Sequence, residues 1–155
     1  MPVFYIDGQS IGNEQKQQPR NAKIAFVYQR TEGGTPTAQD SRVYFKEIGD
    51  KTNNEAEYHA LLAALSYIST NLVPRTLSSA RTRICADSKV VVNQVNGDWK
   101  TEEPRLRQLQ QKAMKRIVEL RLPRLVWVPR EENYAGRWLD GKWKIPRELI
   151  TWNYY

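Results

Sequence analysis

Three carboxylates stand at positions where a folded chain would bring them together. Asp7 and Asp87 each follow a short apolar run, "VFYI" and "RICA", where a strand is expected to end. Strand ends are where sites form in open α/β sheets, because a side chain there is held rigidly and still faces solvent. A lone aspartate at such a place is more often a turn or cap residue, so the case depends on a third acid.

The third acid is Glu57, in the first turn of an expected helix. Ala56, Ala60 and Ala64 mark the side of this helix that packs on the sheet, and Glu57 borders that side. Glu55 points to a different face. Three converging acids repel one another unless a cation lies among them, and oxygen ligands of this kind favour Mg²⁺ or Mn²⁺.

The composition fits one basic domain. The 155 residues are 40% hydrophobic and 26% charged, and the net charge of +7 favours polyanionic partners such as nucleic acid,. The single cysteine, Cys85, excludes an internal disulfide and reads as a buried apolar residue,. We find neither a signal peptide nor a membrane-spanning apolar run. We expect a cytoplasmic monomer.

The expected elements place the three acids around one sheet. Apolar, β-rich runs predict strands at residues 3–7, 22–30, 41–49, 81–87 and 124–129, with a loop from residue 8 to 21,. Apolar spacings of three and four predict helices within residues 52–69, 88–97, 102–120 and 135–139,. Asn53 or Asn54 is expected to cap the first helix. The result is a mixed α/β fold in which helices cover a five-stranded sheet.

Four segments, taken in order, carry a resemblance to a known family. They are "DGQSIGN", "TNNEAEYHALLAAL", "ADSKVVVNQVNGDWK" and "VPREEN". Any one of them is a weak signal, but their order and spacing together are specific. The chain resembles ribonuclease H of type 1 across most of its length. The resemblance implies a sheet of three antiparallel strands followed by two parallel ones, and one catalytic domain over residues 1–155 without a separate hybrid-binding domain.

The resemblance also implies roles for the matching residues. Asp7, Glu57 and Asp87 would be three of four metal-binding, catalytic carboxylates. The residues that would contact nucleic acid are Asn13, Thr52, Asn53 and Asn54. The asparagine pair would read the RNA strand and its 2′-hydroxyls, and Asn13 and Thr52 would hold phosphate of the DNA strand. The "TNN" sequence is equally a capping cluster, and the two roles can coexist.

The implied reaction is hydrolysis of the RNA strand of an RNA–DNA hybrid. Two Mg²⁺ ions, or Mn²⁺ in their place, would support the reaction, and the products would carry a 5′-phosphate and a 3′-hydroxyl.

Two features of the family are missing here. Many members carry a histidine in a loop near the fifth strand as a proton shuttle. The single histidine of this chain, His59, lies in the first helix, where we expect it to be partly exposed. Arg130, in the loop itself, cannot shuttle protons at neutral pH.

Some members also have a basic helical insertion after "NGxW". This insertion is absent here, so basic residues such as Lys89 must bind the substrate.

The position where the family has its fourth acid holds an arginine in this chain. The family pattern places it four residues after Asn133, where this chain has Arg137. We favour Asp140 as the substitute metal ligand and catalytic residue, since it lies one helical turn further on the same face. Gly136 would delay the start of the helix and so shift its register. The alternative is that Asp140 is an exposed helical residue and that the site has three acids.

Three other interpretations remain open from the residues. One is a weakly active or inactive relative that binds nucleic acid as a module, which Arg137 and the missing loop histidine favour. The second is a transposase- or integrase-like relative, which the "TNN" sequence and Glu57 disfavour. The third is a piece of a reverse transcriptase, against which Met1 and the compact length argue weakly.

Overall fold

The structure, a computed structural model, describes residues 2–11, 20–72 and 81–154. Its strands are β1 (Val3–Ile11), β2 (Asn21–Gln29), β3 (Ser41–Gly49), β4 (Arg83–Ala86), β5 (Val126–Trp127) and β6 (Arg147–Leu149). Its helices are α1 (Asn53–Asn71), α2 (Lys89–Val95), α3 (Pro104–Glu119) and α4 (Tyr134–Leu139), with a 3-10 turn at Arg130–Glu132 before α4.

The six strands form one sheet in the order β5-β4-β1-β2-β3-β6. β1, β2 and β3 pair antiparallel, whereas β4 pairs parallel to β1 and β5 parallel to β4, which confirms the expected mixed sheet. β6 was not expected, because its three residues are exposed and show no alternation; it pairs parallel to β3. The loop predicted from residue 8 was wrong over residues 8–11, since pairing with β2 extends β1 to Ile11.

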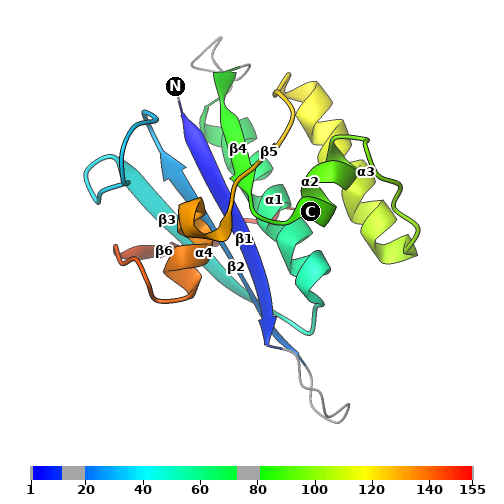
Figure 1. Ribbon diagram of the computed structural model, residues 1–155, viewed down its shortest axis with the longest axis horizontal. Coiled ribbons are helices and arrows are strands. Elements are labelled where there is room, and N and C mark those ends of the chain that lie inside the picture. The colour runs from blue at the N-terminus through cyan, green and yellow to red at the C-terminus, as the bar shows by residue number, and fades with distance from the viewer. Residues whose placement is uncertain (1, 12–19, 73–80, 155) are drawn as a thin grey trace.

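Helices cover both faces of the sheet (Figure 1). On one face α1 packs over β1 and β2, with α3 beside it, and the core there includes Phe4, Ile6 and Phe26. On the opposite face α4 crosses β1 and β2 and covers Ala25 and Val27. Within the described ranges no helix is long and apolar enough to span a membrane.

The start of α1 is fixed by a reciprocal cap. The Thr52 hydroxyl accepts a hydrogen bond from the Glu55 amide at 3.1 Å, and the Glu55 carboxylate accepts one from the Thr52 amide at 3.1 Å. Such a capping box satisfies two backbone donors at once. The prediction of Asn53 or Asn54 as the cap was therefore wrong. Because Glu55 is engaged in the cap, Glu57 is the acid of this turn that remains for chemistry.

A glycine lets β1 and α1 approach each other closely. A Cβ atom added at Gly8 would lie 2.2 Å from the carbonyl carbon of Ala56 and 2.4 Å from the backbone nitrogen of Glu57. Only glycine fits at this backbone contact. The contact holds Glu57 next to Asp7, which precedes Gly8 in the strand.

The aromatic residues near the C-terminus pack on the fold. Trp152 contacts the ring of Tyr44 at a centroid distance of 5.4 Å, and Trp143 contacts Tyr134 at 5.4 Å. Tyr154 is buried against α1, next to His59 at 5.8 Å. Tyr155 lies outside the described residues.

His59 is only 2% exposed, so the expectation of a partly exposed residue was wrong. The tail covers it, which the pattern of α1 alone does not reveal. Burial first, and then the nearby ammonium group of Lys51, lower the pKa of His59 from its ordinary 6.5 to about 4. The imidazole is therefore neutral at physiological pH.

We predict that His59 makes the fold acid-sensitive. Since its pKa is about 4 in the folded state and 6.5 when exposed, its contribution to stability is complete above pH 6.5 and is lost as the pH falls toward 4. The loss is about 1.4 kcal/mol for each pH unit within that window. Denaturant unfolding from pH 7 to 4.5 should show a steeper fall for wild type than for His59→Gln. Parallel curves would contradict this assignment.

Candidate active site

Strand register brings Asp7 and Asp87 side by side. The parallel pairing of β1 with β4 ends at Ile6 and Ala86, and the two aspartates are the next residue on each chain segment. Glu57 reaches the same point from α1. One ligand oxygen from each of these three carboxylates lies within 4.8 Å of the others, which is a spacing that can hold a metal ion. The structure thus brings together the three acids that the sequence singled out.

The electrostatics of the three acids call for a cation. Asp7 is completely buried and Glu57 is 7% exposed, and Oε2 of Glu57 has no hydrogen-bond partner within the described part of the chain. Burial, followed by repulsion from Asp7, raises the pKa of Glu57 well above its ordinary value. Burial likewise raises the pKa of Asp7, although hydrogen bonding, including that from Arg130, opposes the change. A buried carboxylate oxygen without a donor is suited to an ion.

Asn133 ties the site to the sheet. Its side-chain nitrogen donates to the backbone oxygen of Ile6 at 2.9 Å and to Oδ2 of Asp87 at 3.0 Å. Its side-chain oxygen accepts from the Ala135 amide at 3.2 Å and so caps α4. One buried amide therefore links β1, Asp87 and α4, and sets where α4 begins.

The cation among the carboxylates is Arg130. Its Nη1 donates to Oδ1 of Asp7 and to Oδ2 of Asp87, both at 2.8 Å. Its Nη2 lies 3.2 Å from Oδ2 of Asp140. Partial burial works against the charge, but the hydrogen bonds to the three aspartates prevail and raise the pKa of Arg130 further. The guanidinium is thus permanently charged and links three of the four candidate acids.

Asp140 lies beside the compact group, not within it. Nε2 of Gln9 donates to Oδ1 of Asp140 at 2.8 Å and to Oδ2 of Asp7 at 3.1 Å, so one amide spans the two carboxylates. Burial opposes the shift, but hydrogen bonds from Gln9 and Arg130 lower the pKa of Asp140. Its negative charge is therefore directed toward the site.

The proposed register shift at Gly136 was wrong. α4 begins at Tyr134, directly after the Asn133 cap, and Gly136 lies inside the helix. Asp140 caps the other end of this helix and reaches the site through Gln9 and Arg130. Arg137, at the position of the family acid, lies with its guanidinium 5.7 Å from the centre of the Tyr134 ring. It therefore brings no cation to the carboxylates.

Four of the expected substrate-binding residues are described, and they lie at the starts of α1 and α2. Asn53 is exposed, and its side-chain oxygen accepts from the Ser10 amide at 2.8 Å, which fixes β1 to the start of α1. Thr52 is the cap, and Asn54 is partly exposed in the same turn. Lys89 is exposed, with its ammonium group 5.0 Å from the centre of the Trp127 ring. Asn13 lies outside the described residues.

Two site residues escaped the sequence reasoning. Gln9 lies two residues after Asp7, so both side chains lie on the same face of β1. This spacing of two identifies Gln9 only if the strand continues past residue 8, and the sequence predicts a loop there. Trp127 is exposed beside the site, and its indole nitrogen donates to the backbone oxygen of Asp87 at 3.0 Å. Only the folded chain places it next to Asp87.

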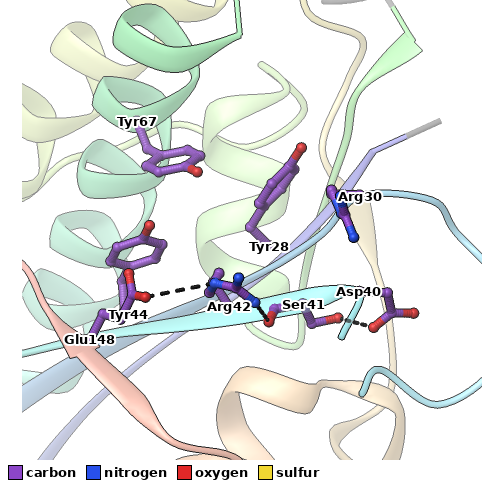
Figure 2. Close-up of a pocket in the computed structure, with 8 residues that line it drawn as sticks. All are labelled: Tyr28, Arg30, Asp40, Ser41, Arg42, Tyr44, Tyr67 and Glu148. Carbon is purple, nitrogen blue, oxygen red and sulfur yellow. Dashed lines mark hydrogen bonds and ion pairs between the residues drawn. The ribbon is translucent and has the colours of Figure 1, made fainter. Parts of the chain in front are cut away.

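A separate hollow of 330 Å³ contains none of the candidate acids (Figure 2). Its lining includes Tyr28, Tyr44 and Tyr67. Arg42 forms an ion pair with Glu148 at 3.7 Å, and the other charged groups bond to the neighbouring backbone and hydroxyls. Because its polar groups are engaged with one another, we assign it no chemistry.

Comparison with known proteins places the chain in a family. Residues 14–139 match the family described as "Reverse transcriptase-like". The bifunctional protein Rv2228c of Mycobacterium tuberculosis is 34% identical over 87% of this chain and 33% of its own length. The ribonuclease HI of Halobacterium salinarum is 30% identical over 83% of this chain and 57% of its own. The chain thus spans about a third to just over half of these relatives.

Solved structures of RNase H domains resemble the fold of this chain. The N-terminal RNase H domain of Rv2228c superimposes with a TM-score of 0.69 at 32% identity, over 91% of each chain. The RNase H1 called LC11, solved in complex with an RNA/DNA hybrid, has a TM-score of 0.67 at 29% identity, over 86% of this chain and 89% of its own. The chain therefore belongs to the reverse transcriptase-like family and, within it, to the type 1 ribonuclease H domains, with an atypical residue at the fourth acidic position.

Proposed function

We propose that this chain is a metal-dependent endonuclease that hydrolyses the RNA strand of RNA–DNA hybrids and leaves 5′-phosphate and 3′-hydroxyl ends. The observation that carries the proposal is the convergence of Asp7, Glu57 and Asp87 within 4.8 Å. Three carboxylates this close repel one another and so destabilise the fold. Their presence together at a buried position therefore fits a role in binding cations. Membership of the ribonuclease H domains supports the choice of reaction.

The residues present fit hard divalent cations. The oxygen-only donor set and the unpartnered Oε2 of Glu57 suit Mg²⁺, with Mn²⁺ as a substitute,. We propose two ions per site, held by Asp7, Glu57 and Asp87, with Asp140 as the fourth ligand. Bound ions of this kind activate a water molecule and stabilise the leaving oxygen.

The protein itself would position the hybrid. The exposed amide of Asn53 and the first turn of α1, with Thr52 and Asn54, offer short donors suited to phosphate and to 2′-hydroxyls. Asn13 would join them. On the other rim, the exposed Lys89 and Trp127 offer a charge and a ring face beside Asp87,. A monomeric state and a cytoplasmic location remain predictions.

A second candidate function is binding of the hybrid without cleavage. One observation favours it: Arg130 already forms ion pairs with Asp7 and Asp87, and a site with an internal cation has less need of a metal ion. Metal-dependent cleavage separates the two candidates.

We predict that a labelled RNA–DNA hybrid is cut in Mg²⁺ and that Asp87→Asn lowers the rate by roughly a hundredfold or more, because it removes ligand charge at the metal site. Asp140→Asn should lower the cleavage rate by a comparable factor if Asp140 is the fourth ligand. Arg137→Ala, which lies away from the acids, serves as the control and should stay within about twofold of wild type.

Two outcomes change this account. If Asp140→Asn cuts as well as wild type, three carboxylates suffice. If wild type binds the hybrid and never cuts it in Mg²⁺ or Mn²⁺, the binding function replaces the enzymatic one.

We also predict that Glu57→Gln stabilises the protein when divalent ions are chelated. The folded-state pKa of Glu57 is raised, so its deprotonation penalises folding at high pH and not at a pH below the ordinary pKa of a glutamate,. At pH 8 the variant should melt a few degrees higher, equivalent to about 1 kcal/mol. Mg²⁺ should raise the Tm of wild type more than that of the variant.

Glu47→Gln, an exposed carboxylate on β3, is the matched control and should change neither value. A Glu57→Gln variant that melts lower than wild type at pH 8, or that responds equally to Mg²⁺, would count against a metal site at Glu57.

A further inference from the structure

The site contains an arginine among its acids. Arg130 extends from the turn before α4 and contacts Asp7 and Asp87 on one side and Asp140 on the other. The contacts on the Asp140 side involve both Nε, at 3.3 Å, and Nη2, at 3.2 Å. The guanidinium therefore lies between the compact group of acids and Asp140. Within the described residues, Arg130 forms no hydrogen bond or ion pair with Glu57.

A missing side chain makes room for this guanidinium. A Cβ atom at Gly136 would lie 2.6 Å from both Cζ and Nη1 of Arg130. The obstructed atoms are the ones that bind Asp7 and Asp87, so even an alanine would force the guanidinium to move. Gly136 is the residue before Arg137 and lies inside α4 with an ordinary helical conformation. Its glycine is thus needed for space and not for backbone freedom.

An arginine and a metal ion compete for the same carboxylate oxygen atoms, because two cations at such close range repel each other. Oδ1 of Asp7 and Oδ2 of Asp87 each accept from Nη1 at 2.8 Å, a short, charge-assisted distance,. The arginine is attached to the site and so acts at a high effective concentration, whereas a metal ion must come from solution. Since Nε and Nη2 of Arg130 also bind Asp140, competition from the arginine would weaken the binding of an ion on the Asp140 side more than on the Glu57 side.

We propose that Arg130 is the built-in occupant of the second cation position. One divalent ion binds with the help of Glu57. A second ion binds between Asp7 and Asp140 only if it displaces the guanidinium. The absence of a side chain at Gly136 provides the space in which the guanidinium lies. This inference rests on the proposed function in one respect, namely that these carboxylates are metal ligands. It explains how the chain balances its acids although Arg137 replaces the usual one.

The test is Mn²⁺ binding to metal-stripped protein, with free Mn²⁺ followed by electron paramagnetic resonance. Wild type should bind one ion tightly and a second weakly. Arg130→Gln removes the competing charge, and Gly136→Ala keeps the arginine but shifts its guanidinium by steric contact. Arg130→Gln should bind the second ion roughly tenfold more tightly or better, since a unit charge close to the ion is removed. Gly136→Ala should also bind it more tightly, because the shifted guanidinium loses its contacts with Asp7 and Asp87. Arg137→Gln is the matched control and should behave as wild type.

Stability provides a second readout. With chelator present, Arg130→Gln should melt at a lower temperature than wild type, because three acids lose their shared partner, and Mn²⁺ should restore more of its Tm. Alanine is favoured over glycine within a helix, so Gly136→Ala is expected to fold.

Four results would overturn the inference. The first is a second-ion affinity that neither Arg130→Gln nor Gly136→Ala changes. The second is a wild type that binds two ions as tightly as the variants do. The third is an equal gain in Arg137→Gln, which would indicate a general charge effect. The fourth is no Mn²⁺ bound by any variant, which would also overturn the proposed function; the first three leave that function intact.

Discussion

Repulsion among carboxylates is the constraint on which the rest of this structure depends. Asp7, Glu57 and Asp87 approach within 4.8 Å in a largely buried setting, where each charge is poorly screened,. The fold holds them there by backbone contacts that the acids themselves do not supply. The end of the β1–β4 pairing sets two of them, and the glycine contact between β1 and α1 sets the third.

The surrounding polar groups share the task of compensation. Asn133 donates to Asp87, Gln9 spans Asp7 and Asp140, and Arg130 reaches three of the acids. Among the buried carboxylate oxygens of the described residues, only Oε2 of Glu57 lacks a hydrogen-bond partner. This asymmetry suggests a division within the site: one side is satisfied by protein groups, and the side of Glu57 is left for an ion.

Much of this was predictable from the sequence. Asp7, Glu57 and Asp87 follow recognisable elements, and their roles come from motifs whose order is specific. The apolar face of α1 and the antiparallel-then-parallel sheet were likewise readable from periodicity and resemblance. These features depend on local patterns, which a sequence displays directly.

What the sequence hid depends on contacts between distant segments. The polar end of β1 is a strand only because β2 pairs with it, and β6 exists only because β3 offers an edge. His59 is buried by a tail that lies about a hundred residues away in sequence. The prediction for the fourth acid relied on a shift of helix register. The contact between Asp140 and the site depends instead on Arg130, whose guanidinium fits beside Gly136, and the sequence does not show this contact.

The most direct test of the central claim uses wild type alone on three duplexes of one sequence: an RNA–DNA hybrid, an RNA duplex and a DNA duplex. Each is incubated with Mg²⁺ and with chelator, and the ends of any products are identified. The account predicts cleavage of the RNA strand of the hybrid only, with Mg²⁺ only, leaving 5′-phosphate ends. Binding of the hybrid without cleavage under any condition would contradict it.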